Sequence, residues 1–582
     1  MVTYQQLRDA TPATYERYAT AWRTVGAAMS EAKDRVEAQV AAGMRKADLK
    51  GAGAEAAQRR LRTLAENHHF TQLQCALIHA ALSGLATDLT AAQRRLAAAG
   101  EDARAAGFTV QDDGSVHWEV AAPHADRGAD GSTPYSPLAD GRAAEAQLYA
   151  DRITAALQEA ADADQGWRAR LDALTADNDL DVTDEDWVDA GEDTEAVGEA
   201  TGSADDIPAG GSPAANAAWW ASLTPDERAR HLALHPERIG ALDGLPAEAR
   251  DEANRAHLAT EAATVQMKLD ELRANEPEKY RVLNGMGGEQ RTTSPEWNAW
   301  RAQVTRYENT RGGIAAIEKR FAQTGERGLP EAYLLGFSAE ADGRVILANG
   351  NPDTAHHTAV YVPGTTTDLP GIGGDLRRMD ELWRASAVRT GDPVSTITWF
   401  GYDAPDDIVK DSPFSHYADD GAGSYSSFLH GLDAAHDQQT PSHTTAIGHS
   451  YGTTLIGSTA RQFDLPVDDV ILAGSPGVQV GNASDLGVPH GHVWNQEARG
   501  DHVPDIGQFG HGAYEPPHME VGPSRVPVFD PGGFIVPSDP EFGANQLTTD
   551  TEGHSDYWKR GTQSLDNQAA VVAGKYHLAQ TQ

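Results

Sequence analysis

The chain has 582 residues, which is too long for one ordinary hydrophobic core, so we expect several domains. The 86 acidic residues outnumber the 47 basic ones and give a formal charge of −39. This balance argues against nucleic acid as a partner, because phosphate binding needs clustered Lys and Arg. A single cysteine, Cys75, excludes an internal disulfide and a cysteine-based zinc site, and we predict that it lies in the core.

No stretch approaches the roughly 20 apolar residues that a membrane span needs. The first residues also lack the basic start and apolar run of a signal peptide. We therefore expect no transmembrane segment, and a protein that stays in the cytoplasm or leaves the cell by a non-classical route.

Residues 1–118 are rich in Ala, Arg, Leu and Glu, with apolar residues at helical spacing, and predict a helical hairpin or bundle. Thr3 followed by Gln6 fits a capping box, and the segment LKGAGAEAA from Leu49 predicts a new helix after a glycine-containing break. The stretch FTVQDDGSVHWEV predicts two short strands joined by a tight turn at its Asp-Gly pair.

The composition changes twice in the middle of the chain. Residues 119–176 predict a loop and a helix, and residues 177–215 concentrate acidic, Gly, Ser and Pro residues. Such a segment cannot bury enough apolar surface to offset the entropy lost on ordering, so we predict a flexible linker, with an acidic interaction tail as the alternative. Helical spacing returns over residues 216–325, where Trp219 and Trp220 are expected to anchor the packing.

Short β-rich segments alternate with helices from residue 326 to residue 582. AYLLGF and RVILANG predict a hairpin, and further strands are predicted by TAVYVPG, STITWFGY, TTAIGHS, DDVILAGS and HVWNQEA. Strands that alternate with helices pair mostly in parallel, and the loops at their carboxyl ends form the functional site. We therefore expect residues 326–582 to form one α/β domain.

The segment TAIGHSYGTT holds Ser450 after an apolar strand and before a helix-compatible run. The bare Gly-x-Ser-x-Gly spacing arises easily by chance in a chain with 57 glycines, so the context decides. A nucleophile elbow requires strand, tight turn and helix, because its serine adopts a strained backbone and only small residues fit two positions away on either side. We interpret Ser450 as a nucleophile rather than as a structural turn.

A serine nucleophile needs a base, and the base needs an acid that orients it. Asp501 follows a predicted strand in HVWNQEARGDHVPD, where the acid is expected, with Asp505 as the alternative. His554 follows a glycine in TTDTEGHSDYW and is the candidate base. Three other histidines compete with it: His502, His511 and His518.

The oxyanion that forms when the serine attacks needs two backbone N–H donors. We expect one from Tyr451, the residue after the serine, and the other from Thr365 or Thr366, in the loop after the predicted strand AVYV. Trp399, Tyr402 and Tyr451 are candidate walls of the substrate site, with core packing as the alternative for Trp399. The glycines of PGIGGD do not match a dinucleotide-binding loop, and no cluster of His and carboxylates predicts a metal, so we expect no cofactor.

These segments resemble an actinobacterial α/β-hydrolase family once called domain of unknown function 1023. The similarity rests on VYVPGTTTDL, WFGYDAP, AIGHSYGTT, the RGDHV loop and the closing GHSDYW. It implies the α/β-hydrolase fold, a mostly parallel sheet with helices on both faces, preceded here by a long all-α region. It also implies Ser450, Asp501 and His554 as a triad. The N-terminal helices resemble the helical-hairpin substrates of type VII secretion, which implies a protein partner for these helices. LKGAGAEAA stands where those substrates carry a Trp-x-Gly turn, but the Trp and a Tyr-x-x-x-Asp/Glu export signal are absent from this region, so a type VII-like export route is an alternative to the cytoplasm.

These features predict a serine hydrolase that cleaves a carboxylic ester, small or lipid-like, through an acyl-enzyme. Lipase, carboxylesterase, thioesterase and peptidase share this machinery, and the fold does not choose among them. The alternative is a secretion-associated or partner-binding protein whose helices are the working part and whose hydrolase domain is a scaffold. Retention of all three triad candidates favours catalysis.

Overall fold

A computed structural model describes residues 2–119, 137–175, 182–285, 288–437, 439–521, 527–530 and 532–582. The chain divides into two compact units. The first contains Met1–Glu31, His68–Asp181 and Asp189–Ala204, and the second contains Ala32–Asn67, Val182–Val188 and Asp205–Gln582.

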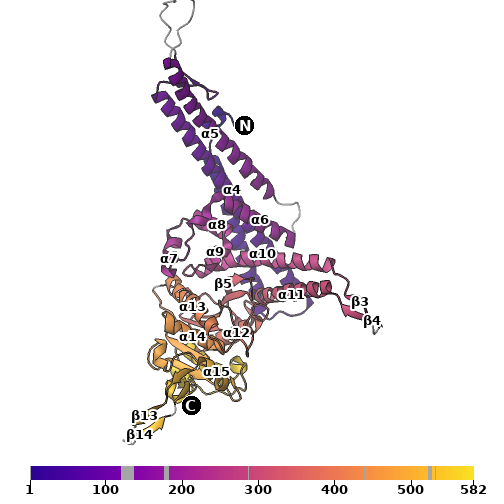
Figure 1. The fold of residues 1–582 in the computed structure, drawn as a ribbon, viewed down its shortest axis with the longest axis vertical. Helices are drawn as coiled ribbons and strands as arrows, with labels where there is room; N and C mark the ends of the chain where they lie inside the picture. Colours follow the sequence, from indigo (N-terminus) through magenta and orange to yellow (C-terminus); the bar gives the residue numbers. More distant parts are fainter. Residues whose placement is uncertain are drawn as a thin grey trace, which may run out of the picture. The chain divides into compact units, whose positions relative to one another are not determined.

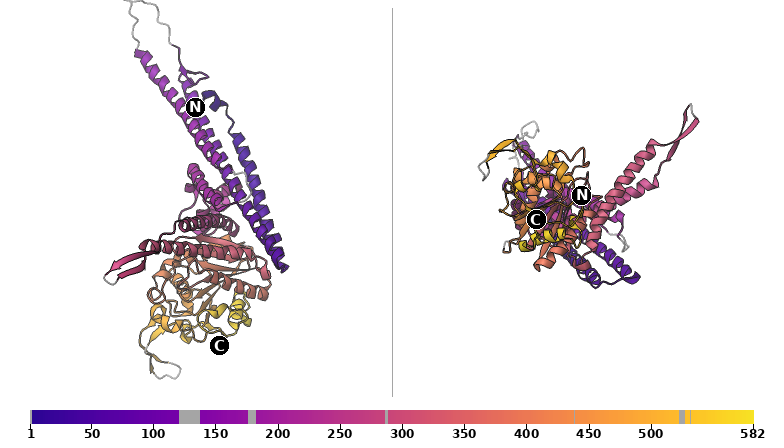
Figure 2. Two further views of the ribbon diagram at one scale, coloured as in Figure 1. Left: turned by 90° about the vertical axis from the view of Figure 1, so that its right-hand side faces the viewer. Right: turned by 90° about the horizontal axis from the view of Figure 1, so that it is seen from below.

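Long helices make up most of the first unit. They are α1 (Tyr4–Asp9), α2 (Ala13–Asp34), α4 (Ala52–Ala105), α5 (Pro137–Ala173) and α6 (Asp184–Thr201), of which α2, α4 and α6 each have one end in the second unit. The predicted capping box at Thr3 and Gln6 is present. Helix α5 runs alongside α4 (Figures 1 and 2), and Trp167 Nε1 donates a hydrogen bond to Asp88 across this pair at 2.7 Å. The predicted hairpin is also found, as strands β1 (Thr109–Val110) and β2 (Val116–His117).

Among the described residues, α4 is the one helix with a stretch both long and apolar enough to be considered for a membrane span. By length and composition alone it could cross a membrane, but 61% of this stretch is buried inside the molecule. Cys75 lies within it and is buried, as predicted. The burial is typical of a core helix, so α4 is weak evidence for a membrane span.

The prediction of a flexible linker over residues 177–215 is wrong for the described part, and residues 177–181 lie outside it. Residues 184–201 form α6, in which Trp187, Ala190 and Val197 are buried. Three acidic residues in its first turn stabilise the helix end, because they face the positive end of the helix dipole. The acidic composition therefore conceals a sparse apolar face that is sufficient for burial. The loop part of residues 119–176 falls largely on 120–136, outside the described residues.

The second unit begins with helical elements before its sheet. They are η1 (Arg35–Ala41), α3 (Ala42–Lys46), η2 (Ser203–Asp206), α7 (Pro213–Ser222), α8 (Pro225–Leu234), α9 (Pro236–Ala241), α10 (Ala247–Ala274), α11 (Pro295–Ala322) and η3 (Glu326–Gly328). Strands β3 (Tyr280–Gly285) and β4 (Gly288–Thr293) pair between α10 and α11. Trp220 is buried and Trp219 packs beside it in a small core, as predicted.

The predicted boundary between residues 216–325 and 326–582 does not separate compact units. Leu258 of α10 and Ile314 of α11 belong to the same hydrophobic core as the sheet. Asn254 Nδ2 also donates a hydrogen bond to the carbonyl oxygen of Leu334 in the sheet at 3.0 Å. The helices cover apolar side chains at one edge of the sheet, so both parts fold as one body.

The sheet has eight strands in the order β16-β11-β10-β9-β7-β8-β6-β5. Their bounds are β5 (Ala332–Ser338), β6 (Arg344–Asn349), β7 (His357–Val362), β8 (Val394–Phe400), β9 (His443–His449), β10 (Asp469–Ala473), β11 (Val493–Gln496) and β16 (Asn545–Gln546). All neighbours pair in parallel except β5 with β6 and β6 with β8. Every predicted strand of this part is confirmed, including the β5–β6 hairpin.

Helices cover both faces of this sheet, as predicted (Figure 1). Successive residues of β7 point to opposite faces. Val360 packs in one core with side chains of α13 (His416–Ala435) and α14 (Tyr451–Gln462). Tyr361 packs in the other core with side chains of α12 (Gly373–Thr390) and α16 (Gln563–Val572).

Smaller elements follow the strands toward the C-terminus. They are η4 (Ala483–Leu486), α15 (Val503–His511), β12 (Ala513–Glu515), β13 (His518–Val521), β14 (Pro527–Asp530), β15 (Gly533–Ile535), η5 (Pro540–Phe542), η6 (Asp556–Trp558) and η7 (Tyr576–Leu578). β12 pairs with β15, and β13 with β14.

A buried carboxylate joins the amino ends of three strands to the C-terminal segment. Asp469 begins β10 and accepts hydrogen bonds from His443 (2.7 Å), Trp494 (2.8 Å), Tyr576 (2.8 Å) and His492 (3.0 Å). Burial by itself would raise the pKa of Asp469, but the hydrogen bonds outweigh burial and lower it. Burial would likewise lower the pKa of His443, but the hydrogen bond and charge of Asp469 raise it.

We expect the cost of replacing His443 by Gln to depend on pH. Because the pKa of His443 in the fold lies above its unfolded value, its contribution is fully present below the unfolded pKa and is lost as the pH rises through the folded pKa. The free energy of unfolding should therefore fall by about 1 kcal/mol more at about pH 5.5 than at about pH 9. Urea unfolding at both pH values measures this. His490→Gln, at an exposed position, is the control, and an equal cost at both pH values would contradict the prediction.

Candidate active site

Ser450 lies at the sharp turn between β9 and α14. Its backbone has φ 54° and ψ −129°, a conformation that residues other than glycine rarely adopt. The N–H of Ser450 donates a hydrogen bond to the carbonyl oxygen of Ala473 at the end of β10, at 3.0 Å. The expected strand, strained turn and helix are therefore present around this serine.

Two glycines flank Ser450 at positions where no side chain fits. A Cβ atom on Gly448 would lie 2.7 Å from the Cα atom of Thr453. A Cβ atom on Gly452 would lie 2.2 Å from the carbonyl oxygen of Val362, in the neighbouring strand. The small residues expected on both sides of the serine are therefore a steric requirement of this turn.

Asp501 and His554 are brought together from two later loops. Asp501 follows β11 and its side chain is fully buried, while the His554 side chain, after β16, is 30% exposed. His554 Nδ1 donates to both carboxylate oxygens of Asp501, at 2.9 and 3.0 Å. This bond fixes the orientation of the imidazole and leaves its Nε2 atom as the one able to accept a proton.

The Asp501 carboxylate has two further donors. Tyr557 donates its hydroxyl at 2.6 Å, and the N–H of Val503 donates at 3.0 Å. Burial would raise the pKa of Asp501, but the hydrogen bonds from His554 and Tyr557 outweigh burial and lower it. Asp501 therefore carries a negative charge that can stabilise a protonated His554.

Tyr557 was not identified from the sequence as part of the site. Its hydroxyl also accepts a hydrogen bond from the N–H of Ala498 at 3.0 Å, so it holds the loop that carries Asp501. The available signal was its place three residues after His554, in the short helical turn η6 that follows the His554 loop.

His449, immediately before Ser450, was also missed. Its Nε2–H donates to the carbonyl oxygen of His554 at 2.7 Å, and the two rings lie 4.6 Å apart. Burial, with the nearby charge of Arg378, places the pKa of His449 well below its ordinary value. His449 is therefore a neutral support that links the serine turn to the His554 loop.

The structure places Ser450 beside the Asp501–His554 pair without a direct hydrogen bond. Within the described residues, His554 Nε2 has no hydrogen-bond partner, and Ser450 retains 9% exposure. Gly474 lies against the pair, because a Cβ atom on it would be 2.6 Å from Asp501 Oδ2 and 3.0 Å from His554 Nδ1. The preceding residue, Ala473, binds the N–H of Ser450. The end of β10 thus contacts both the backbone of Ser450 and the side chains of Asp501 and His554.

The loop after β7 passes directly beside the serine. A Cβ atom on Gly364 would lie 2.7 Å from Ser450 Cβ and 3.2 Å from its Oγ. The N–H of Thr366 donates to the carbonyl oxygen of Pro405 at 2.8 Å, so the prediction of Thr366 as an oxyanion donor is wrong. Thr365, next to Gly364, is the remaining candidate from this loop. Tyr451 begins α14, and its N–H has no partner within the helix.

The competing acid and histidines lie elsewhere. Asp505 is exposed and faces His502 at 3.5 Å rather than His554. His511 is buried and donates to the carbonyl oxygen of Ser412 at 2.5 Å, and His518 lies 3.6 Å from Glu515. Of the two predicted acids, the structure therefore brings Asp501 to His554.

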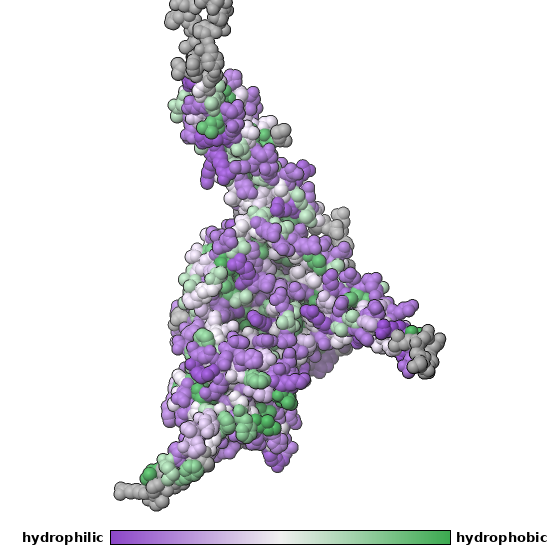
Figure 3. Space-filling view, viewed as in Figure 1, coloured by the Kyte–Doolittle hydropathy of each residue, from purple (hydrophilic) through white to green (hydrophobic). Residues whose placement is uncertain are grey.

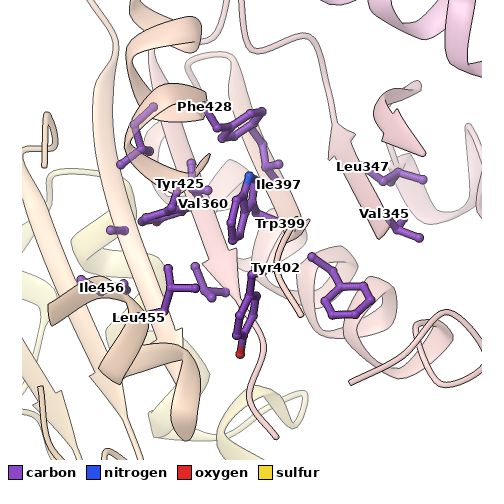
Figure 4. Close-up of a cluster of buried hydrophobic side chains, with 14 of the residues drawn as sticks. Val345, Leu347, Val360, Ile397, Trp399, Tyr402, Tyr425, Phe428, Leu455 and Ile456 are labelled. Atoms are coloured by element: carbon purple, nitrogen blue, oxygen red, sulfur yellow. The ribbon is translucent and has the colours of Figure 1, made fainter. Parts of the chain in front are cut away.

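Trp399 and Tyr402 belong to the core rather than to an open substrate wall. They are 1% and 2% exposed and stack on each other among Tyr425, Phe428 and Leu455 (Figure 4). Large aromatic rings at the end of a buried strand bury the most apolar surface by packing in the core. The Tyr402 hydroxyl donates to the carbonyl oxygen of Pro363 at 2.9 Å, so it braces the loop that carries Gly364.

Two cavities lie away from these residues. One of about 610 Å³ lies between α11 and residues 339–342 and 368–370, and one of about 530 Å³ lies near the amino ends of β7 and β9. Neither is lined by Ser450, Asp501 or His554. In the described part of the chain, no three His, Cys, Asp or Glu residues are arranged to hold a metal ion.

Comparisons with known proteins agree with this fold. The model of a family described as alpha/beta hydrolase matches residues 339–511. An uncharacterized protein of Mycobacterium tuberculosis (strain CDC 1551 / Oshkosh) is 29% identical over 383 residues, which cover 61% of this chain and 55% of that protein. The chain thus spans about half the length of this relative. An uncharacterized protein of Mycobacterium bovis is 38% identical over 205 residues, which cover 33% of this chain and 76% of that protein.

Among solved structures, a hyperthermophilic esterase from the archeon Pyrobaculum calidifontis is similar to 47% of this chain over 90% of its own length. The sequence identity is 12% and the TM-score is 0.25.

We expect Gly474→Ala to disable the Asp501–His554 pair, because the new methyl group overlaps both side chains. Gly487→Ala is the matched control, since Gly487 has a similar positive φ, 75° against 59°, but open space around it. Both variants should lose about 1–2 kcal/mol of stability through backbone strain. Only Gly474→Ala should slow the reaction of Ser450 with a fluorophosphonate, by about a hundredfold. Equal labelling rates in the two variants would contradict this.

Proposed function

We propose that this chain, which belongs to the alpha/beta hydrolase family, is a serine hydrolase that cleaves a carboxylic ester through an acyl-enzyme. The observation that carries the proposal is Ser450 at a strained turn beside a histidine whose Nδ1 is held by a buried carboxylate. A surface serine or a structural turn would need neither the strain nor the Asp501–His554 pair.

The proposed reaction begins with attack of Ser450 Oγ on the ester carbonyl carbon. His554 Nε2 accepts the hydroxyl proton, and Asp501 stabilises the resulting imidazolium through Nδ1. The N–H groups of Tyr451 and Thr365 stabilise the oxyanion of the tetrahedral intermediate. The intermediate collapses, the alkoxide leaves with the proton from His554, and the acyl group remains on Ser450.

Water then completes the reaction. His554 takes a proton from a water molecule, whose oxygen attacks the acyl carbon, and the second tetrahedral intermediate releases the carboxylic acid as Ser450 regains its proton. Asp501 stays ionised throughout, which its lowered pKa favours.

The alternative of a binding protein with an inert hydrolase domain is not favoured, because an inert domain has no need of an intact triad. A protein partner for the N-terminal helices, their kinship with type VII secretion substrates and the cellular location stay predictions.

We expect the full chain to be labelled by a fluorophosphonate probe and to hydrolyse p-nitrophenyl esters, and both activities should vanish in Ser450→Ala. His554→Ala and Asp501→Asn should each lower kcat by about a thousandfold or more, because attack then lacks its base or the base its orientation. Ser484→Ala, at an exposed serine, is the control. Labelling that persists in Ser450→Ala would refute the proposal, and a series of acyl chain lengths would define the substrate class.

We expect Tyr557→Phe to lower kcat/KM about tenfold, because a positioning residue for Asp501 is lost. The pKa of Asp501 should rise toward its ordinary value, which moves the acid limb of the pH–rate profile to higher pH. Tyr576→Phe removes the same kind of hydrogen bond from Asp469 at the other end of the sheet and is the matched control. An unchanged pH profile in Tyr557→Phe would show that the hydroxyl has a purely structural role.

A further inference from the structure

Three parts of the second unit expose large apolar side chains near the carboxyl end of the sheet. They are the loop after β8, helix α15, and the β13–β14 hairpin. Their large apolar side chains are between 58% and 80% exposed, and together we call them the apolar rim: Ile408, Val409, Phe414, Ile506, Phe509, Met519, Val521 and Phe529. Scattered apolar residues are normal on a protein surface, but such a gathering marks an interaction site.

Helix α15 turns its apolar side outward. Ile506 and Phe509 are three residues apart, so they share a face of the helix, and they are 72% and 71% exposed. Pro504 and His511 are the buried residues of the same helix. A surface helix ordinarily buries its apolar face, so the pattern of α15 is reversed.

The hairpin shows the same feature. Met519 lies directly opposite Phe529 in the antiparallel pair, and Val521 is two residues from Met519, so the three side chains share one face. All three are exposed. Figure 3 shows hydrophobic residues gathered over the region of α15 and along this hairpin.

The apolar rim borders the proposed catalytic site. The Tyr451 hydroxyl donates to the carbonyl oxygen of Phe414 at 2.5 Å, and the hydroxyls of Thr365 and Ser412 are 2.8 Å apart. His511, at the end of α15, donates to the carbonyl oxygen of Ser412. Helix α15 begins two residues after Asp501. The rim is therefore continuous with the loops that carry the proposed oxyanion donors and the proposed acid.

We propose that the apolar rim docks the protein on the surface of aggregated neutral lipid, so that Ser450 acts on esters held at that surface. This proposal rests on the proposed function and names its substrate class. The high exposure of Val409, Ile506 and Phe509 fits a broad apolar surface, since a groove for a single acyl chain would enclose its lining.

The charges near the rim select the kind of lipid. The loop stretch PDDIVKDSPF holds three Asp and one Lys, and α15 contains Asp505 but no Lys or Arg. Attraction to anionic membranes requires clustered cations, which the described residues of this loop and of α15 lack, and the whole chain is strongly negative. A neutral or zwitterionic lipid surface therefore fits better than an anionic one, and apolar side chains supply the affinity.

Flotation of the full chain with an emulsion of triolein and phosphatidylcholine tests this proposal. The test variant is Ile506→Ser/Phe509→Ser, and Val388→Ser, at an 86% exposed position on α12, is the matched control. Circular dichroism and thermal melting check that both variants fold. We expect both to fold, because exposed side chains contribute little to stability. Ser450→Ala is floated in parallel.

We expect the wild type, Val388→Ser and Ser450→Ala to float equally, and the dissociation constant of the double variant to rise about tenfold or more. Vesicles of phosphatidylserine should bind less than the neutral emulsion. Equal flotation of the double variant, absence of wild-type flotation, or a dimer that the double variant converts to a monomer would overturn the proposal. Ser450→Ala tests docking separately from catalysis. Docking should persist in this variant, and an error in the proposed reaction alone would leave the flotation results unchanged.

Discussion

The site depends on the backbone of Ser450, which the fold holds at a positive φ between β9 and α14. This conformation is unfavourable for a side chain and persists only where its surroundings over-determine it. Here Gly448 allows α14 to turn back on β9, and Gly452 allows the helix to press on the end of β7. A hydrogen bond from the Ser450 N–H to Ala473 ties the turn to β10. The serine is thereby presented at the carboxyl ends of three neighbouring strands.

Two buried carboxylates lie at opposite ends of the sheet, and each accepts hydrogen bonds from several donors. Asp469 and Asp501 both have lowered pKa values because several donors outweigh the effect of burial. Asp469 binds its histidines and Tyr576 at the amino ends of the strands, where it joins the C-terminal segment to the sheet. Asp501 binds one histidine whose Nε2 has no hydrogen-bond partner among the described residues. The first arrangement stabilises the fold, and the second can move a proton.

The carboxyl end of the sheet also concentrates the surface features of this unit. The loops after β8 and β11 contact each other through Ser412 and His511, and each carries part of the apolar rim. These two loops thus contribute the proposed acid and an exposed apolar surface. Through Ser412 they also hold Thr365, one of the proposed oxyanion donors. Parallel strands make this possible, because their carboxyl ends all meet at one edge.

The sequence by itself determined the α/β order of strands, the turn at Ser450, and the pairing of an aspartate and a histidine from later loops, because these follow from local periodicity, glycine spacing and chain order. Only the tertiary structure decided that Asp501 rather than Asp505 binds His554, and that the N–H of Thr366 donates to the carbonyl oxygen of Pro405. It also decided that Trp399 and Tyr402 are buried. It also ordered α6 and brought Tyr557 and His449 to the site. Those outcomes depend on which groups meet across distant segments, and hydrogen bonds and burial between such segments leave no periodic trace in the chain.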